Sequence, residues 1–220
     1  MSSILETLRV CFPTPLLAFF LCLMIVTVCL IGDAMLTKAA LVNLHGTYSV
    51  PMLRAFVDSS THAAVGFLVW AMVENASLLT DYSKWGNCIV AAVLAASVDV
   101  DHFLAAGSFR LEKALHLEKR PPFHNTSLVL LGTLICVFLS KWRPKMWVFT
   151  LMFLSSWLSH HIRDANHRGL WIAPFGHTPL FSTQFYILCI LVLAVCVRIS
   201  VVFLRSSASS ISSENFVRTV

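Results

Sequence analysis

The chain has 220 residues, of which 57% are hydrophobic and 12% are charged, and its mean hydropathy is +0.78. This composition excludes an ordinary soluble domain and is typical of helical membrane proteins. The net charge of +5 does not indicate a nucleic-acid partner, because the basic residues are scattered between apolar runs and form no basic helix face. We therefore expect membrane lipids as partners and no nucleic acid, while the sequence identifies no protein partner.

Six apolar runs predict membrane-spanning helices, because most of them are long enough to cross the hydrocarbon core. The first exceeds a signal-peptide core and lacks a small-x-small cleavage site after it, so we expect it to be retained. The predicted fold is an all-α polytopic bundle of about six transmembrane helices, and thus an integral, multi-pass membrane protein of unassigned organelle. In chain order the runs cover about 10–32, 58–80, 87–107, 125–140, 146–162 and 180–204.

The segments between the runs are more polar. Residues 34–57 predict a loop with a short interfacial helix, and residues 108–123 predict a polar surface loop closed by Pro121 and Pro122, which no helix interior tolerates. Residues 206–220 are serine-rich and predict a disordered tail. Residues 1–205 therefore form a single predicted transmembrane domain.

The third run contains an unusual group of ionisable residues. Asp99, Asp101 and His102 lie within four positions of an otherwise apolar stretch, 91–107. Ionisable groups inside a membrane are costly, and they usually face a partner, a metal ion or a water-filled cavity. This group therefore indicates a functional site.

Other polar residues fall at the ends of predicted spans that share one side of an up-and-down bundle. Their spacing is also helical: Asp58 and His62, Asp99 and His102, and His160 and Asp164 each lie on one face of a helix. The residues on this side are Asp33, Asp58, His62, Asp99, Asp101, His102, His124, His160, His161 and Asp164.

Imidazole and carboxylate groups together suit a divalent zinc, manganese or iron ion, and facing helices of a bundle commonly supply such spaced ligands. A metal ion there would activate water for hydrolysis, and we expect a lipid or phosphoester at the membrane interface as the substrate. We expect His62 and His124 as acid/base groups or additional ligands. The predicted core ligands are Asp99, Asp101, His102, His160 and Asp164.

Three strings make the chain resemble a known family: SVDVDHFLAAGS, RPPFHNT and SWLSHHIRDANHRGLWIAPFGHTPL. They are similar to the vertebrate transmembrane protein 267 family of uncharacterised multi-pass membrane proteins, over Asp58 to about Tyr186. The same residues more loosely resemble bacterial inner-membrane predicted metal-dependent hydrolases, which implies hydrolase activity. In that resemblance, Lys119 stands where the bacterial pattern has its first histidine, and Val98 replaces its proline.

Two other functions remain open from the sequence. One is a non-catalytic structural or regulatory membrane protein with a vestigial metal or polar site, in which the charged groups simply hold helices together. The other is a carrier or proton relay, which would need titratable groups through the membrane depth, whereas only Glu74 and Arg198 lie toward the opposite side. Arg120, Arg163 and Arg168 are on the site side and could bind a phosphate headgroup.

Overall fold

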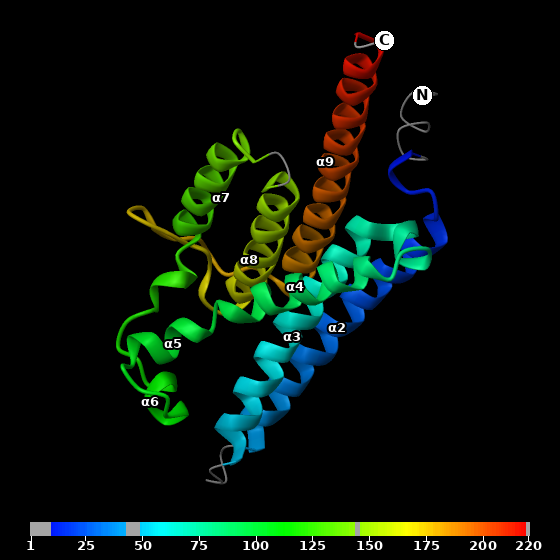
Figure 1. Ribbon diagram of the computed structural model, residues 1–220. Coiled ribbons are helices and arrows are strands. Elements are labelled where there is room, and N and C mark those ends of the chain that lie inside the picture. Colours follow the sequence, from blue (N-terminus) through cyan, green and yellow to red (C-terminus); the bar gives the residue numbers. More distant parts are fainter. Residues whose placement is uncertain (1–9, 43–48, 144–145, 219–220) are drawn as a thin grey trace.

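The computed structural model describes residues 10–42, 49–143 and 146–218, and its fold is all-α (Figure 1), which confirms the predicted class. Two short 3-10 helices, η2 and η3, and a two-stranded hairpin interrupt the helices. The elements are α2 (Pro15–Val42), α3 (Ser49–Glu74), η2 (Asn75–Leu79), α4 (Ser83–Ser97), α5 (Val100–Ala105), α6 (Leu111–Leu115), η3 (Pro122–His124), α7 (Thr126–Ser140), α8 (Met146–Arg168), β1 (Trp171–Ile172), β2 (Gly176–His177) and α9 (Thr183–Arg218).

Four helices in the described part of the chain are long and apolar enough to cross a membrane: Pro15–Ala39, Pro51–Leu79, Ser83–Ala105 and Thr183–Ser206. The other two predicted spans correspond to α7 and α8. Helix α7 is apolar but has only 15 residues, and α8 has 23 residues but carries buried serines and histidines along its length. The prediction of about six spans is therefore approximate.

The loop predicted over residues 34–57 is wrong. Helix α2 continues to Val42, and α3 begins at Ser49 with Pro51 in its first turn, where proline is tolerated; residues 43–48 lie outside the described residues. Asp33, Asp58 and His62 therefore lie within helices rather than at their ends. Exposed apolar side chains lie on both helices here, such as Met35 of α2 and Phe56 of α3.

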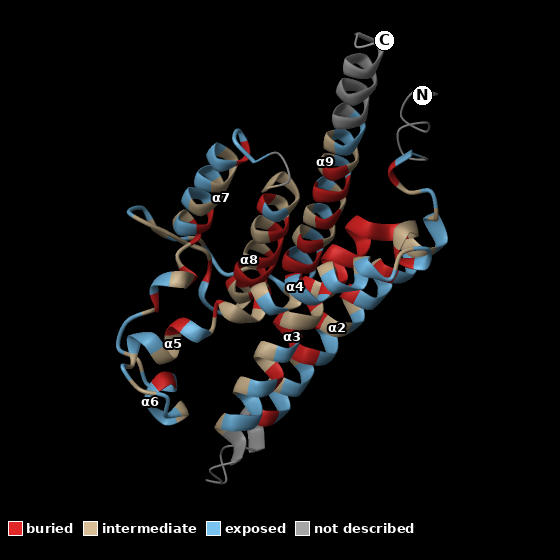
Figure 2. Cartoon of the chain, in the orientation of Figure 1, coloured by how far each residue is buried: buried red, intermediate tan, exposed pale blue. Residues whose placement is uncertain are grey.

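Helix α8 packs against α3, α4, α7 and α9 and thereby occupies the centre of the bundle (Figure 1). Buried residues concentrate on α8 and where α3 and α9 meet it (Figure 2). Trp70 and Tyr186 are among the largest fully buried side chains of this core. His160 and His161 of α8 therefore lie in the buried part of the structure.

Buried polar groups also lie at the C-terminal end of α3, away from His62. Glu74 accepts a hydrogen bond from Asn87 and pairs with Arg205 of α9 at 3.3 Å. Arg198 of α9 donates to the carbonyl of Val73, in the last turn of α3, where carbonyls have no partner within the helix, and to the carbonyl of Cys11, which precedes α2. The backbone of α9 is helical to Arg218, so the segment after Ser206 continues this helix.

Helices α3 and α4 approach closely at Gly66. A Cβ atom added there would lie 2.6 Å from the Cβ of Ala95 and 2.9 Å from the carbonyl oxygen of Ala91. Both separations are too short for non-bonded atoms, so only glycine permits this helix spacing. Because α3 carries His62 and α4 leads into Asp99, the close approach also positions the site.

Gly66→Ala should therefore lower the free energy of unfolding by about 1–3 kcal/mol through overpacking. Gly86→Ala, in α4, is the matched control, since a Cβ at Gly86 meets nothing within 4 Å and alanine favours the helix. Thermal unfolding of both variants in detergent micelles tests this prediction. Equal melting temperatures for the two variants would contradict it.

Candidate metal centre

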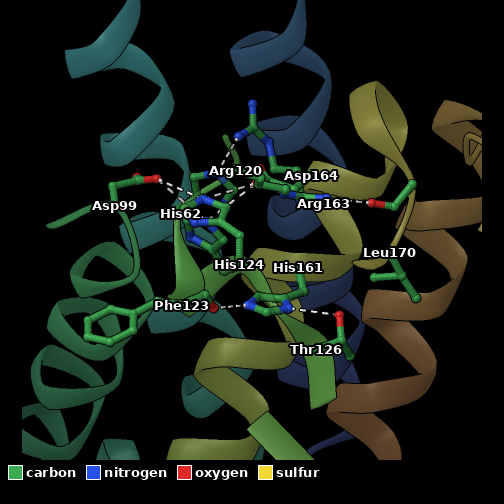
Figure 3. A network of polar contacts seen from close by, with 12 residues as sticks. His62, Asp99, Arg120, Phe123, His124, Thr126, His161, Arg163, Asp164 and Leu170 are labelled. Atoms are coloured by element: carbon green, nitrogen blue, oxygen red, sulfur yellow. Dashed lines mark hydrogen bonds and ion pairs between the residues drawn. The ribbon is translucent and has the colours of Figure 1, made fainter. Parts of the chain in front are cut away.

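The structure brings together the ionisable residues that the sequence singled out, from α3, α5, η3 and α8 (Figure 3). Three groups of donor atoms each lie within 4.8 Å of one another in the described residues. The groups are His62, Asp99 and His160; Asp99, His102 and His124; and His124, His160 and Asp164. Asp99 and Asp164 thus link histidines from different helices.

A backbone carbonyl at the junction between α4 and α5 orients His160. The amide of Asp99 bonds to the carbonyl of Ala96 at 3.3 Å, rather than to Ala95 as in a regular α-helix. The carbonyl of Ala95 instead lies 2.9 Å from His160 Nδ1, which can donate to it. His160 Nε2 is then left as the ring nitrogen with a lone pair, buried and without a hydrogen-bond partner.

A carboxylate, that of Asp101, orients His124 by contacting one of its ring nitrogens. Its Nδ1 lies 3.3 Å from Asp101 Oδ2, and Asp101 is fully buried and also accepts the Phe123 amide at 2.6 Å. His124 Nε2 faces the opposite way, 3.6 Å from Asp99 Oδ1 and 3.5 Å from Asp164 Oδ2. Bonding of one ring nitrogen fixes the orientation of the other, as in known metal sites.

Donor atoms of four residues face one another: Nε2 of His124, Nε2 of His160, Oδ1 of Asp99 and Oδ2 of Asp164. The four nitrogen-to-oxygen distances are 3.5 to 3.7 Å. Ligands each about 2.1 Å from one tetrahedral metal ion lie about 3.4 Å apart, so these four distances fit a shared ion, although the two carboxylates belong to no common group within 4.8 Å. We call these four residues the donor cluster.

Asp101 and His102, two of the predicted ligands, lie beside the donor cluster. Asp101 is in none of the three groups and contacts the Nδ1 atoms of both His124 and His102. His102 groups with Asp99 and His124, and its ring meets that of His124 edge-on at 4.8 Å. In this arrangement Asp101 orients histidines, and sequence spacing alone does not distinguish that role from direct ligation.

His62, predicted as an acid/base group, stacks on His160 with ring centroids 3.6 Å apart. Its Nε2 lies 3.3 Å from Asp164 Oδ1, which is the carboxylate oxygen turned away from His124. It also accepts from Arg163 at 3.1 Å. Arg163 lies three residues after His160 on the same face of α8. The sequence places it on the site side but does not indicate its contact with His62.

His161 points away from the donor cluster, as Figure 3 shows. Its Nε2 lies 2.9 Å from the Phe123 carbonyl and its Nδ1 lies 3.0 Å from the Thr126 hydroxyl. These bonds attach η3 and the start of α7 to α8. His161 therefore positions the segment that carries His124.

Arg120 comes from the predicted polar loop and covers the donor cluster (Figure 3). One nitrogen donates to the carbonyl of Gly169 at 3.1 Å, and another lies 3.7 Å from Asp164 Oδ2. Gly169 ends α8 with φ +68°, and a Cβ there would lie 2.1 Å from the carbonyl oxygen of Thr178, so glycine is required. Lys119, by contrast, is exposed.

Negative charge exceeds positive charge in this part of the structure. Five carboxylates share two arginines: Arg163 pairs with Asp33 and Asp58 and Arg120 pairs with Asp164, which leaves Asp99 and Asp101 without an arginine. Buried charge of one sign is costly unless a cation compensates for it. The excess favours a bound cation. The carboxylates are those of Asp33, Asp58, Asp99, Asp101 and Asp164, and the arginines are Arg120 and Arg163.

The pKa of His124 responds to this excess. Burial alone would lower it, but the adjacent Asp101 and Asp99 carboxylates outweigh burial and raise the pKa to about 9. The folded, metal-free protein therefore binds a proton more tightly than the unfolded chain, whose histidine pKa is about 6.5.

The contribution of His124 to the stability of the metal-free protein should accordingly be fully present below pH 6.5 and be lost, by on the order of 2–3 kcal/mol, as the pH rises through about 9. His124→Gln should remove most of this slope. Thermal unfolding in detergent with excess chelator, from pH 6 to 9.5, measures it. A slope that persists unchanged in the variant would show that another group causes it.

Sequence comparison finds curated vertebrate relatives named Transmembrane protein 267. The chain is 39% identical to the Mus musculus protein over 139 residues, 62% of this chain and 63% of the relative. It is 38% identical to the Xenopus laevis protein over 138 residues, 61% and 63% of the two chains, and 35% identical to the Danio rerio protein over 142 residues, 61% of each. The matched part thus spans about 63% of the length of the first of these relatives.

No protein-family profile matches the chain. No solved structure matches it either. The relatives' names agree with the four apolar helices. The chain is therefore similar to vertebrate transmembrane proteins, and it is a membrane protein.

Proposed function

We propose that the chain is a multi-pass membrane protein that binds a divalent zinc, manganese or iron ion and hydrolyses an anionic ester, such as a phosphoester of a lipid. The observation that carries this proposal is that both histidines of the donor cluster have one ring nitrogen bonded and turn the other toward the same two carboxylates. Histidines in a merely structural polar network need no common point, whereas those that ligate a metal ion do.

The ligand set leaves room for chemistry. Two imidazoles and two carboxylates leave open positions on six-coordinate manganese or iron, and zinc can expand to five ligands. A metal ion held there would lower the pKa of a bound water and polarise a phosphoryl oxygen. The contribution of the chain is to orient the ligands through Asp101 and the Ala95 carbonyl, and to place charge around the substrate.

Arg120 favours an anionic substrate over a neutral one. Its side chain is only 11% exposed, yet its Nε has no hydrogen-bond partner. One guanidinium nitrogen lies beside Asp164 of the donor cluster, where an oxygen of a metal-bound phosphate would be close. Arginine is well suited to phosphate because it can donate two parallel hydrogen bonds.

Purified wild-type protein should contain stoichiometric metal, measured by inductively coupled plasma mass spectrometry. His160→Ala and Asp164→Asn should each lose it, because each removes a donor atom, whereas Asp101→Asn should weaken binding by about 10–100-fold through the orientation of His124. His167→Ala is the control, since His167 is exposed on the same helix. Wild-type protein without metal, prepared without chelator, would refute the proposal.

Arg120→Gln should lower kcat/KM for bis-p-nitrophenyl phosphate by about 10–100-fold, because hydrogen bonds to charged groups contribute about 1.5–3 kcal/mol. The variant should hydrolyse the neutral ester p-nitrophenyl acetate as the wild type does and retain its metal. An equal loss with both esters would contradict an anion-binding role. Stoichiometric metal without hydrolysis of either ester would instead favour the non-catalytic alternative.

A further inference from the structure

Asp164 separates the donor cluster from a second group of ligand-type atoms. Its Oδ2 faces His124 and His160, whereas its Oδ1 lies 3.3 Å from His62 Nε2. His62 Nε2 in turn lies 3.6 Å from Asp58 Oδ1. These two separations resemble the nitrogen-to-oxygen distances of the donor cluster, although the three residues do not form a group within 4.8 Å; a cation beside His62 Nε2 would be compensated by either carboxylate.

The guanidinium of Arg163 already lies among these atoms. Its NH1 donates to Asp58 Oδ1 at 2.6 Å and to His62 Nε2 at 3.1 Å, and its NH2 donates to Asp33 Oδ1 at 3.0 Å. The hydroxyl of Tyr186 donates to the other oxygen of Asp33. Arg163 is buried, and four helices, α2, α3, α8 and α9, meet through these bonds.

We infer that Arg163 takes, as a permanent cation, the position that a second metal ion would otherwise occupy, so that the wild-type centre binds one metal ion. This inference rests on the proposed function, because it concerns the same site. The lone pair of His62 Nε2 accepts from Arg163 and is not free for a metal ion. Asp164 would then bind the metal ion through Oδ2, while its Oδ1 lies beside His62, which accepts a hydrogen bond from Arg163.

The metal-to-protein ratio tests this inference with zinc or manganese alone. After equilibrium dialysis at saturating metal, the wild type should hold one equivalent and Arg163→Gln should hold two. The double variant Arg163→Gln with His62→Ala should return to one, because the second site loses its imidazole. Manganese in the Arg163→Gln variant should also give the exchange-coupled electron paramagnetic resonance spectrum of two adjacent ions, which the wild type lacks.

A further variant keeps the test decisive if Arg163→Gln does not fold. His62→Gln alone should still hold one equivalent at saturating metal, because His62 is not a ligand in the wild type. Loss of that equivalent, two equivalents in the wild type, or one in folded Arg163→Gln would each overturn the inference while leaving the proposed metal site intact. No metal in the wild type would overturn both.

Discussion

The structure depends on compensating negative charge inside an apolar helical bundle. Carboxylates from α2, α3, the α4–α5 junction and α8 gather there, fully buried at Asp101 and partly buried at the others. Each needs a cation or hydrogen-bond donors to remain there. Arg163 and Arg120 satisfy part of this requirement. The remaining excess explains why histidine nitrogens surround Asp99 and Asp164, and it supports a site for a metal ion.

Irregular backbone makes this arrangement possible. The interruption between α4 and α5 releases the Ala95 carbonyl for His160, and η3 places His124 opposite it. Non-helical backbone is tolerated at membrane depth only where protein or a polar cavity covers it. Here the segment from Gly169 to Thr178 packs beside η3, through the bonds of Arg120 to Gly169 and of Ser127 to Ala173.

The sequence was sufficient to predict the all-α class and the residues that meet. Charge inside apolar runs is rare enough to mark a site, and helical spacing placed His160 and Asp164 on one face. It was insufficient to predict the helical structure within residues 34–57, because alanine and leucine there favour a helix as strongly as their polar neighbours favour a loop. It also could not assign Asp101, since orienting a histidine and ligating a metal require the same residue type. Which oxygen of Asp164 faces which histidine depends on side-chain packing that no spacing rule encodes.

Helix α9 is attached to the rest of the bundle at two levels. Tyr186 bonds to Asp33 of α2 at one level, and Arg198, twelve residues later, bonds to the ends of α3 and the chain before α2 at the other. At 1.5 Å per residue these attachments are about 18 Å apart along the helix axis. A helix held at two such points can neither slide nor rotate without breaking buried polar bonds at both. Helix α9 is therefore fixed in position at both levels, and movement around the donor cluster is expected from the elements on the other side of α8 instead.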